Sequence, residues 1–264
     1  MKRLVDKYGK WVLITGASSG IGKAFAYRLA DEGFNLVLAA RRIQRLEEIA
    51  VDLRNRYKID IIIVQVDLTK DDFLKIIIDA IGDKEINLLI NNAGVGAAGE
   101  LISIDPQVEV DMIKLNCIAP VELTQHFAKK MMQRKKGGII FLGSTVANQG
   151  TPLMSVYAAT KAFNLILGEG LWYEMKQHSV DVLVVNPGGT NTEFQRISDM
   201  SSGPFVRESS DVVNTALSAL GKKPVIVDGF INKMMAFGSK ILPAKTATTI
   251  AGAIAGNLHK MKGK

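Results

Sequence analysis

Short apolar runs rich in β-branched residues alternate with stretches of helical periodicity along most of the chain. The apolar runs predict strands at 10–15, 35–40, 60–66, 86–91, 138–142, 181–185 and 224–227. The helical stretches predict helices at 20–33, 44–57, 71–81, 105–134, 155–178 and 209–220. Strands that are apolar nearly throughout are buried on both faces, and their alternation with helices indicates right-handed crossovers between parallel strands. The pattern therefore predicts an α/β fold, a doubly wound and mainly parallel seven-stranded sheet with helices on both faces.

The chain of 264 residues is expected to form one domain, because no Pro-, Gly- or Ser-rich linker divides it. Its composition, with 47% hydrophobic and 22% charged residues, is typical of a globular protein. We expect a single domain over 1–264, with a lid over the substrate at about 190–222 and a basic amphipathic tail at about 230–264. The turn-like stretch Ser201-Ser202-Gly203-Pro204 lies within the expected lid.

The formal net charge of +7 is concentrated in the tail, since six lysines and no acidic residue occur from Gly229 onward. The rest of the chain is nearly neutral, which argues against a nucleic-acid partner. Met234, Phe237 and Ile241 share one face of a predicted short helix, and the apolar stretch 247–256 is too short to span a bilayer. The tail either packs on its own subunit or a partner and closes the substrate pocket, which we favour, or makes reversible peripheral contact with an anionic membrane.

Cysteine and histidine are too few and too scattered for a disulfide framework or a local metal motif. Cys117 is the single cysteine, and His126, His178 and His259 do not follow zinc-binding spacing. We therefore expect no bound metal. The N-terminus lacks the apolar core of a signal peptide, and no run of about 18 apolar residues occurs. These observations predict a soluble, cytoplasmic protein.

A glycine-rich turn follows the first predicted strand and opens directly into a helix. Its sequence, TGASSGIG at 15–22, allows a tight turn and lets the amides at the helix N-terminus approach a pyrophosphate. The spacing Gly-x-x-x-Gly-x-Gly differs from the common Gly-x-Gly-x-x-Gly and from a Walker loop. The turn indicates a dinucleotide site, although the same glycines could form an ordinary strand-to-helix junction.

Two arginines, Arg41 and Arg42, follow the second predicted strand, where a fold that binds NAD usually presents an acidic residue to the adenosine ribose. A carboxylate would repel the 2′-phosphate of NADP, whereas a guanidinium can bind it through two hydrogen bonds. The pair therefore predicts NADP(H) as the cofactor. The alternative is two solvated side chains at the start of a helix.

Together with motifs farther along, these residues resemble the compact single-domain branch of the short-chain dehydrogenase/reductase family. The resemblance extends from Lys10 to about Thr192 and returns at 225–229. It implies a Rossmann fold in which Asp67 contacts the adenine and the loop from Pro187 to Thr192 lies beside the nicotinamide carboxamide. The cofactor-binding residues that it implies are Gly16, Ser18, Ser19, Gly20, Ile21, Gly22, Arg41, Arg42, Asp67, Leu68, Asn92, Ala93, Gly94, Tyr157, Lys161, Pro187, Gly188 and Thr192.

The resemblance also implies four catalytic residues: Asn116, Ser144, Tyr157 and Lys161. Tyr157 and Lys161 are four residues apart and so share one helix face, where the ammonium would lower the pKa of the tyrosine and make it a usable acid and base. Ser144 follows the fifth predicted strand, and its hydroxyl can donate to a substrate oxygen. In the family the lysine also holds the nicotinamide ribose, and the asparagine anchors a water in a proton relay. The cofactor itself supplies the hydride.

The ordered set of motifs predicts an NADP-dependent oxidoreductase that transfers a hydride between nicotinamide and a carbonyl or alcohol substrate. The alternative is a catalytically silent dinucleotide-binding regulatory protein, and the intact tetrad argues against it. A sugar-nucleotide epimerase is disfavoured by chain length and glycine spacing. One position departs from many NADP-preferring relatives, which have a basic residue where this chain has Ser19. The 2′-phosphate would then rest on Arg41, with help from Ser18 or Arg42.

The apolar side chains between 192 and 237 suggest a lid over an apolar cavity. An apolar ketone or a 3-oxoacyl compound is the expected substrate, and the resemblance offers 3-oxoacyl thioesters, steroid-like ketones and small xenobiotic carbonyls as candidates. The long helices predicted at 105–134 and 155–178 form the usual subunit interface of relatives, which implies a homodimer or a homotetramer. The alternative is a monomer whose tail covers those faces.

Overall fold

The computed structural model describes residues 3–194 and 206–262 and contains a seven-stranded sheet. Its strands are β1 (Trp11–Thr15), β2 (Asn35–Ala40), β3 (Ile61–Gln65), β4 (Ile86–Asn91), β5 (Gly137–Leu142), β6 (Val180–Asn186) and β7 (Val225–Val227). Their order is β3-β2-β1-β4-β5-β6-β7, and every neighbouring pair is parallel. The doubly wound sheet expected from the sequence is confirmed, and the predicted strand ends shift by at most one residue.

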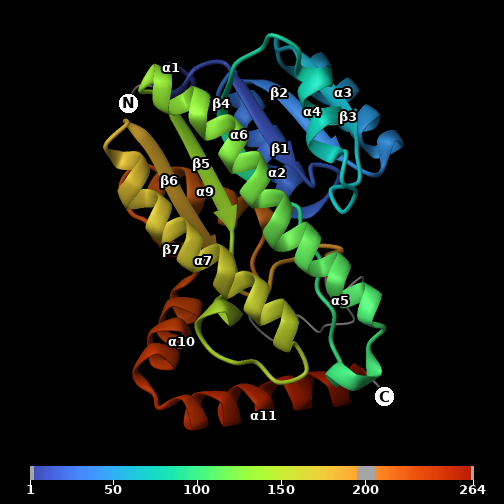
Figure 1. Ribbon diagram of the computed structural model, residues 1–264, viewed down its shortest axis with the longest axis vertical. Coiled ribbons are helices and arrows are strands. Elements are labelled where there is room, and N and C mark those ends of the chain that lie inside the picture. The colour runs from blue at the N-terminus through green and yellow to red at the C-terminus, as the bar shows by residue number, and fades with distance from the viewer. Residues whose placement is uncertain (1–2, 195–205, 263–264) are drawn as a thin grey trace.

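Helices cover both faces of this sheet (Figure 1), and each face has its own layer of buried apolar side chains. One face is covered by α2 (Gly20–Asp31), α3 (Ile43–Arg56) and α9 (Ser209–Ala219), and the other by α4 (Phe73–Ile81), α6 (Ala119–Arg134) and α7 (Ser155–Lys176). Successive strand residues point to opposite faces, so Val12 and Ile14 enter the first layer and Leu13 enters the second. Burial on both sides explains why the strands are apolar nearly throughout.

The helix predicted as continuous over 105–134 is divided. It begins as α5 (Pro106–Ile113), passes through a π-helical turn at Lys114–Ile118 and continues as α6. Pro120 has no N–H, so the carbonyl of Asn116 lacks the donor that an α-helix provides four residues later. The side-chain amide of Asn164 on α7 donates to this carbonyl at 2.8 Å instead. The interruption thus has a cause in the sequence, and it lies at a residue assigned to catalysis.

Two helices form the end of the chain, α10 (Phe230–Ile241) and α11 (Ala244–Lys262), whereas the sequence indicated only a short helix followed by an apolar stretch. They lie beyond the carboxyl ends of the strands, and α11 runs along the bottom of the view in Figure 1. The 3-10 turn η3 (Thr145–Asn148) contacts α10. At the opposite end, the short helix α1 (Leu4–Tyr8) precedes β1. No helix in the described part of the chain is long and apolar enough to cross a membrane.

The segment expected to cover the substrate, about 190–222, is described only in part, because 195–205 lie outside the described residues. Arg207 pairs with the loop after β6: its amide donates to Gly189 and its carbonyl accepts from Asn191, at 2.9 and 2.8 Å. Its guanidinium also forms an ion pair with the buried carboxylate of Asp228 at 3.0 Å. The part of the expected lid at 209–219 is α9, which packs on α2 and belongs to the body of the domain instead.

Candidate active site

The glycine-rich turn forms a close junction between β1 and the N-terminus of α2. Gly16 and Gly20 have φ values of +66° and +52°, which residues other than glycine rarely adopt. A Cβ at Gly22 would overlap the carbonyl oxygen of Gly16, so only glycine fits there. Ser19 precedes α2 without capping it through its side chain, which leaves amides of the first helical turn available at the groove. Such a helix end stabilises an anion, as a pyrophosphate would require.

A groove along the carboxyl ends of the strands brings together most of the residues assigned to the cofactor. Those that line it are Gly16, Ser18, Ser19, Gly20, Ile21, Arg41, Arg42, Asp67, Leu68, Asn92, Ala93, Gly94, Tyr157, Lys161, Pro187, Gly188 and Thr192. Gly22 does not line it, because it packs beneath Gly16. The Thr15 hydroxyl accepts hydrogen bonds from the amides of Asn92 and Ala93, both at 3.0 Å, and so joins the ends of β1 and β4.

Arg42 is the arginine that the glycine-rich turn holds in place. Its guanidinium donates to the hydroxyl of Ser18 at 3.1 and 3.3 Å and to that of Ser19 at 2.8 Å. Arg41 is exposed, lines the same groove and makes no side-chain hydrogen bond within the described residues. The sequence placed the larger share of phosphate binding on Arg41. The structure shows that Arg42 supplies a positive charge against Ser19, where the chain lacks a basic residue.

Asp67 lies in the groove just beyond β3. Thr69 donates to its carboxylate twice, from the amide at 3.0 Å and from the hydroxyl at 2.9 Å. Burial acts to raise the pKa of Asp67, but the two hydrogen bonds and the nearby Arg41 outweigh it and lower that pKa below its ordinary value. The carboxylate is therefore ionised and fixed in orientation, as an acceptor for an amino group requires.

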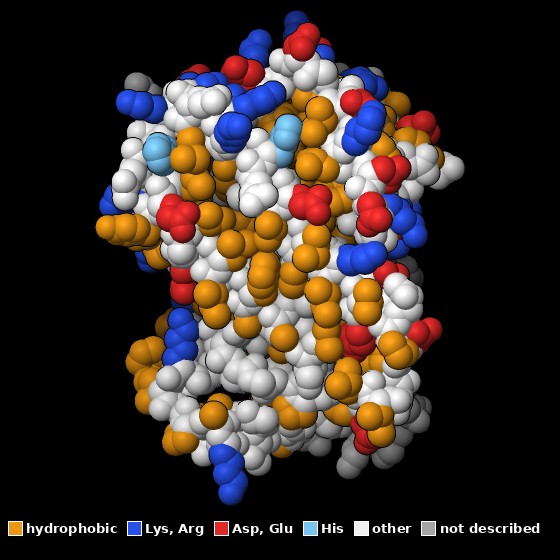
Figure 2. Space-filling model, in the orientation of Figure 1, with side chains coloured by type: hydrophobic (Ala, Val, Ile, Leu, Met, Phe, Trp, Pro, Cys, Tyr) orange, Lys and Arg blue, Asp and Glu red, His pale blue; other side chains and the backbone are white. Residues whose placement is uncertain are grey.

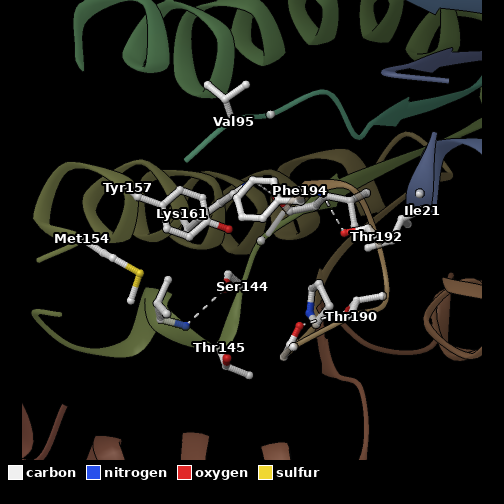
Figure 3. A pocket seen from close by; sticks show the side chains of 18 of the residues that line it. Ile21, Val95, Ser144, Thr145, Met154, Tyr157, Lys161, Thr190, Thr192 and Phe194 are labelled. Atoms are coloured by element: carbon white, nitrogen blue, oxygen red, sulfur yellow. Dashed lines mark hydrogen bonds between the residues drawn. The ribbon is translucent and has the colours of Figure 1, made fainter. Parts of the chain in front are cut away.

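Tyr157, Lys161 and Ser144 lie together at another part of the groove (Figure 3). Tyr157 and Lys161 occupy the first turns of α7 and are 7% and 5% exposed, and Ser144 caps the turn after β5. The Ser144 hydroxyl accepts from the amide of Val146 at 3.4 Å, and Ser144 acts to lower the pKa of Tyr157. The ammonium of Lys161 donates to the carbonyl of Leu142 at 2.8 Å and lies 5.8 Å from the centre of the Tyr157 ring. Three groups able to donate a proton or a hydrogen bond thus meet at one place.

Burial dominates the ionisation of this cluster. It raises the pKa of Tyr157 to about 12, although the nearby Ser144 hydroxyl, as a hydrogen-bond donor, acts in the opposite direction. It also lowers the pKa of Lys161 to about 8, and the neighbouring Cys117 thiol opposes that change. Burial thus opposes the lowering of the Tyr157 pKa that was expected from the ammonium of Lys161, which donates to the carbonyl of Leu142. Tyr157 is therefore a proton donor at neutral pH.

Asn116 is completely buried and does not line the groove. Its side chain exchanges two hydrogen bonds with Val95: it accepts from the amide at 3.0 Å and donates to the carbonyl at 2.9 Å. It also donates to the Thr160 hydroxyl at 3.0 Å. A Cβ at Gly94 would lie 3.1 Å from Asn116 Oδ1 and 3.3 Å from Lys161 Nζ. Asn116 thus lies behind the cluster as a positioning residue that ties the loop after β4 to α7.

The groove continues into an apolar cavity beneath the C-terminal helices, and the two together enclose about 810 Å³. Figure 2 shows the hollow between these helices and the body. The large apolar side chains that line it are Val95, Met154, Phe194, Met235, Leu242, Ile250 and Ile254. The tail expected at about 230–264 and the lid expected at about 190–222, which includes Phe194, both contribute to this lining. The sequence did not identify which residues of the tail face inward. A signal was present in α11, where the buried residues Ala247, Ala251 and Ala255 recur every four positions and mark a packed face.

Comparisons with known proteins agree with this geometry. The family model described as short chain dehydrogenase matches residues 10–201. Human 17-beta-hydroxysteroid dehydrogenase type 3 is 32% identical over 220 residues, which cover 80% of this chain and 71% of the human protein.

Two solved structures extend the comparison. A 7beta-hydroxysteroid dehydrogenase superposes with a TM-score of 0.88 and 25% identity, over 94% of this chain and 99% of that one. A short-chain dehydrogenase from Sphingobium yanoikuyae in complex with NADPH has a TM-score of 0.79 and 33% identity, over 87% and 92% of the two chains. The first of these superpositions extends over nearly the whole chain.

Proposed function

The chain belongs to the short-chain dehydrogenase/reductase family, and on that premise we propose that it is an NADP(H)-dependent oxidoreductase that interconverts a bulky apolar ketone and its alcohol. The principal support is the position of Tyr157, Ser144 and Lys161, which line the space shared by the glycine-rich groove and the apolar cavity. A proton donor at that junction faces both a cofactor in the groove and a carbonyl group in the cavity.

The groove fits both the pyrophosphate and the adenine of a dinucleotide. Close backbone approach at Gly16, Gly20 and Gly22 leaves room for a pyrophosphate, and the fixed carboxylate of Asp67 suits an adenine amino group. When bound, the cofactor donates or accepts the hydride.

The protein's own groups handle the proton. In reduction the hydroxyl of Tyr157 gives its proton to the substrate oxygen, and in oxidation it takes that proton back. Ser144 holds the same oxygen through its hydroxyl. Lys161 places a positive charge beside the tyrosine below about pH 8, which favours the phenolate that forms when the proton leaves. The apolar walls of the cavity limit the access of water to these groups.

NADP(H) is proposed over NAD(H) because Ser18, Ser19, Arg41 and Arg42 form a polar, cationic cluster at the groove. Guanidinium and hydroxyl groups are donors that a phosphate monoester prefers. The NADPH bound to the Sphingobium yanoikuyae relative supports this choice.

A steroid-sized substrate is proposed ahead of a 3-oxoacyl compound. The cavity has large apolar side chains on the body and on both C-terminal helices, which suits a rigid apolar ring system. The human relative and the 7beta-hydroxysteroid dehydrogenase bear the names of enzymes that act on hydroxysteroids.

A second copy of the chain is the proposed partner. An apolar face on α5, the π-helical turn and α7 includes Val110, Ile113, Ile118, Phe163, Ile166 and Tyr173, each between 40% and 69% exposed. Figure 2 shows apolar side chains gathered over α6 and α7. A groove of about 610 Å³ between these two helices could receive side chains of the partner. Exposed apolar area of this kind is typical of subunit interfaces.

Turnover separates the enzyme from a silent binding protein. We expect the purified protein to oxidise NADPH with steroid ketones faster than with 3-oxoacyl-CoA or small ketones, as followed at the absorbance of NADPH. Tyr157→Phe should keep the NADPH dissociation constant within about twofold and lower kcat about a thousandfold, because only the transferable proton is removed. Tight NADPH binding without turnover on any carbonyl by the wild type would favour the silent binding protein.

Cofactor preference is tested at Arg41. Arg41→Asp exchanges a cation in the groove for an anion, so kcat/KM with NADPH should fall at least about tenfold while that with NADH is kept. Lys58→Asp makes the same charge change at an exposed position outside the groove and serves as the control. An unchanged ratio of the two cofactors in Arg41→Asp would place the phosphate elsewhere.

A further inference from the structure

A carboxylate from a distant part of the chain pairs with Arg42 of the groove and with the neighbouring Arg45. Glu193, in the loop after β6, forms an ion pair with Arg42 at 2.7 Å. Arg45, in the first turn of α3, donates to both oxygens of the same carboxylate, each at 2.7 Å. Glu193 is 151 residues from Arg42 and 148 from Arg45, so the fold alone brings these charges together.

Glu193 lies next to the proposed phosphate site. The same guanidinium of Arg42 that pairs with Glu193 also holds Ser18 and Ser19. The preceding residue, Thr192, lies against the glycine-rich turn, since a Cβ at Gly20 would approach its methyl group at 3.0 Å. Glu193 therefore reaches the arginines from the loop that borders the groove.

A phosphate monoester and a carboxylate make the same demands on this cluster. Both are anions that accept paired hydrogen bonds from guanidinium groups, and two anions cannot share the same donors without repulsion. Hydrogen bonds from Arg45 and Arg42 lower the pKa of Glu193 to about 2, so the carboxylate keeps its charge over the working pH range.

We propose that Glu193 is an internal counter-anion of the 2′-phosphate site, which the 2′-phosphate of NADP(H) displaces from Arg42 and Arg45. The inference rests on the proposed use of NADP(H) and adds a specificity-determining residue to it. A cofactor without the 2′-phosphate leaves the Glu193 ion pairs in place. Glu193 thus weakens the binding of NADP(H) and not that of NAD(H). It thereby limits the preference for NADP(H) that Arg42 and Arg45 provide.

The test compares ligands that differ only in the phosphate. Wild type, Glu193→Gln and Glu208→Gln are titrated by calorimetry with NADPH, NADH, 2′,5′-ADP and 5′-ADP. The two nucleotides without nicotinamide isolate the adenosine end from any effect at Tyr157. In Glu193→Gln we expect NADPH and 2′,5′-ADP to bind about fivefold more tightly, the size of a partly exposed ion pair, and NADH and 5′-ADP to change less than twofold.

Glu208→Gln is the matched control. Its exposed carboxylate accepts from Asn191 at 3.2 Å, two residues before Glu193, and has no contact with either arginine among the described residues. The same loss of charge there should leave all four dissociation constants unchanged. Glu193→Asp keeps the charge but shortens the reach, so it should tighten NADPH binding less than Glu193→Gln does.

Equal or weaker binding of NADPH and 2′,5′-ADP in a folded Glu193→Gln protein would overturn the proposal, since Glu193 would then orient the arginines for the phosphate. An equal gain for NADH would overturn it as well. Failure of the underlying function looks different, because wild-type protein would then bind 2′,5′-ADP no more tightly than 5′-ADP. Thermal unfolding of each variant checks the fold. If Glu193→Gln does not fold, the same outcomes are judged from the dissociation constants of Glu193→Asp for NADPH and 2′,5′-ADP.

Discussion

Lys161 is a basic side chain that is almost entirely buried, and folding therefore opposes its protonation. Leu142 accepts its hydrogen bond, Cys117 lies near it on the π-helical turn, and Tyr157 lies one turn back on α7. Its pKa falls from 10.5 to about 8, so the unfolded chain binds this proton more readily between those two pH values. Protonated Lys161 thus destabilises the fold below about pH 8, and this cost disappears as the pH rises toward 10.5.

Lys161→Met should reveal this cost. Below pH 8 we expect the variant to be more stable than the wild type by about 2 kcal/mol. Removal of the buried charge stabilises the fold by more than the loss of the hydrogen bond to Leu142 destabilises it. The difference should shrink between pH 8 and 10, as measured by urea denaturation at each pH. Lys176→Met, at an exposed position of the same helix, should show no such trend. If the stabilities of Lys161→Met and the wild type changed with pH in parallel, protonated Lys161 would not be the cause of the destabilisation.

The division between α5 and α6 shows how one element is adapted to the site. The proline at position 120 removes a backbone donor, and the freed carbonyl of Asn116 bonds to Asn164 on α7. The side chain of Asn116 then bonds to Val95 and Thr160. A π-helical turn of this kind often occurs at a functional site, and here it links the loop after β4 to the helix that contains Tyr157.

Pro120→Ala restores a donor that competes with Asn164 for the Asn116 carbonyl. We expect kcat to fall about tenfold with little change in KM, because a small displacement of the positioning residue misaligns the catalytic groups. The midpoint of thermal unfolding should stay within a few degrees of the wild type. Pro106→Ala is the control, since this proline begins α5, where no backbone donor is needed. Equal rates for both variants would mean that the π-helical turn does not position Asn116.

Assembly belongs to the scale of the whole molecule, and Ile166 on the apolar face of α7 offers a direct test. Its side chain is 69% exposed, so a lysine there costs the isolated subunit little. In a subunit interface the same lysine would bury a charge, and we expect the dissociation constant of the dimer to rise at least about a hundredfold. Sedimentation equilibrium measures it. Val51→Lys, at a 57% exposed position of α3, should assemble normally. Assembly of Ile166→Lys as in the wild type would move the interface elsewhere.

The C-terminal helices are the second feature at this scale. Removing residues 230–264 takes away the wall formed by α10 and α11, and we expect KM for a bulky ketone to rise at least about tenfold through the loss of apolar contact. Affinity for 2′,5′-ADP should change less than twofold, because Arg41, Arg42 and Asp67 lie on other elements. Unchanged kinetics and assembly would refute the role of the tail.

Liposome sedimentation of the full chain tests the alternative role of these helices. Phe230, Met234, Phe237 and Ile241 are 58% to 77% exposed along one side of α10. Salt-sensitive binding to anionic vesicles that is lost with residues 230–264 would favour membrane contact. The favoured reading, in which the tail closes the pocket, predicts no such binding.

The sequence by itself determined the sheet, because a strand buried on both faces needs apolar residues at nearly every position, and this pattern is visible without the fold. It also located the groove, since Gly16, Gly20 and Gly22 are required by backbone conformation and close approach, which depend on local geometry. Tyr157 and Lys161 could be placed on one helix face by spacing alone. These features depend on neighbours in the chain.

Only the tertiary structure decided which charges and apolar surfaces meet. It placed Arg42 against Ser19, and it brought Glu193 to Arg42 and Arg45 from about 150 residues away. It buried Asn116 behind the site and decided which side chains of α11 line the cavity. It also set burial against the expected lowering of the pKa of Tyr157, since burial depends on every element packed around the phenol. Contacts and burial of this kind arise between segments far apart in the chain, and sequence spacing contains no measure of those distances.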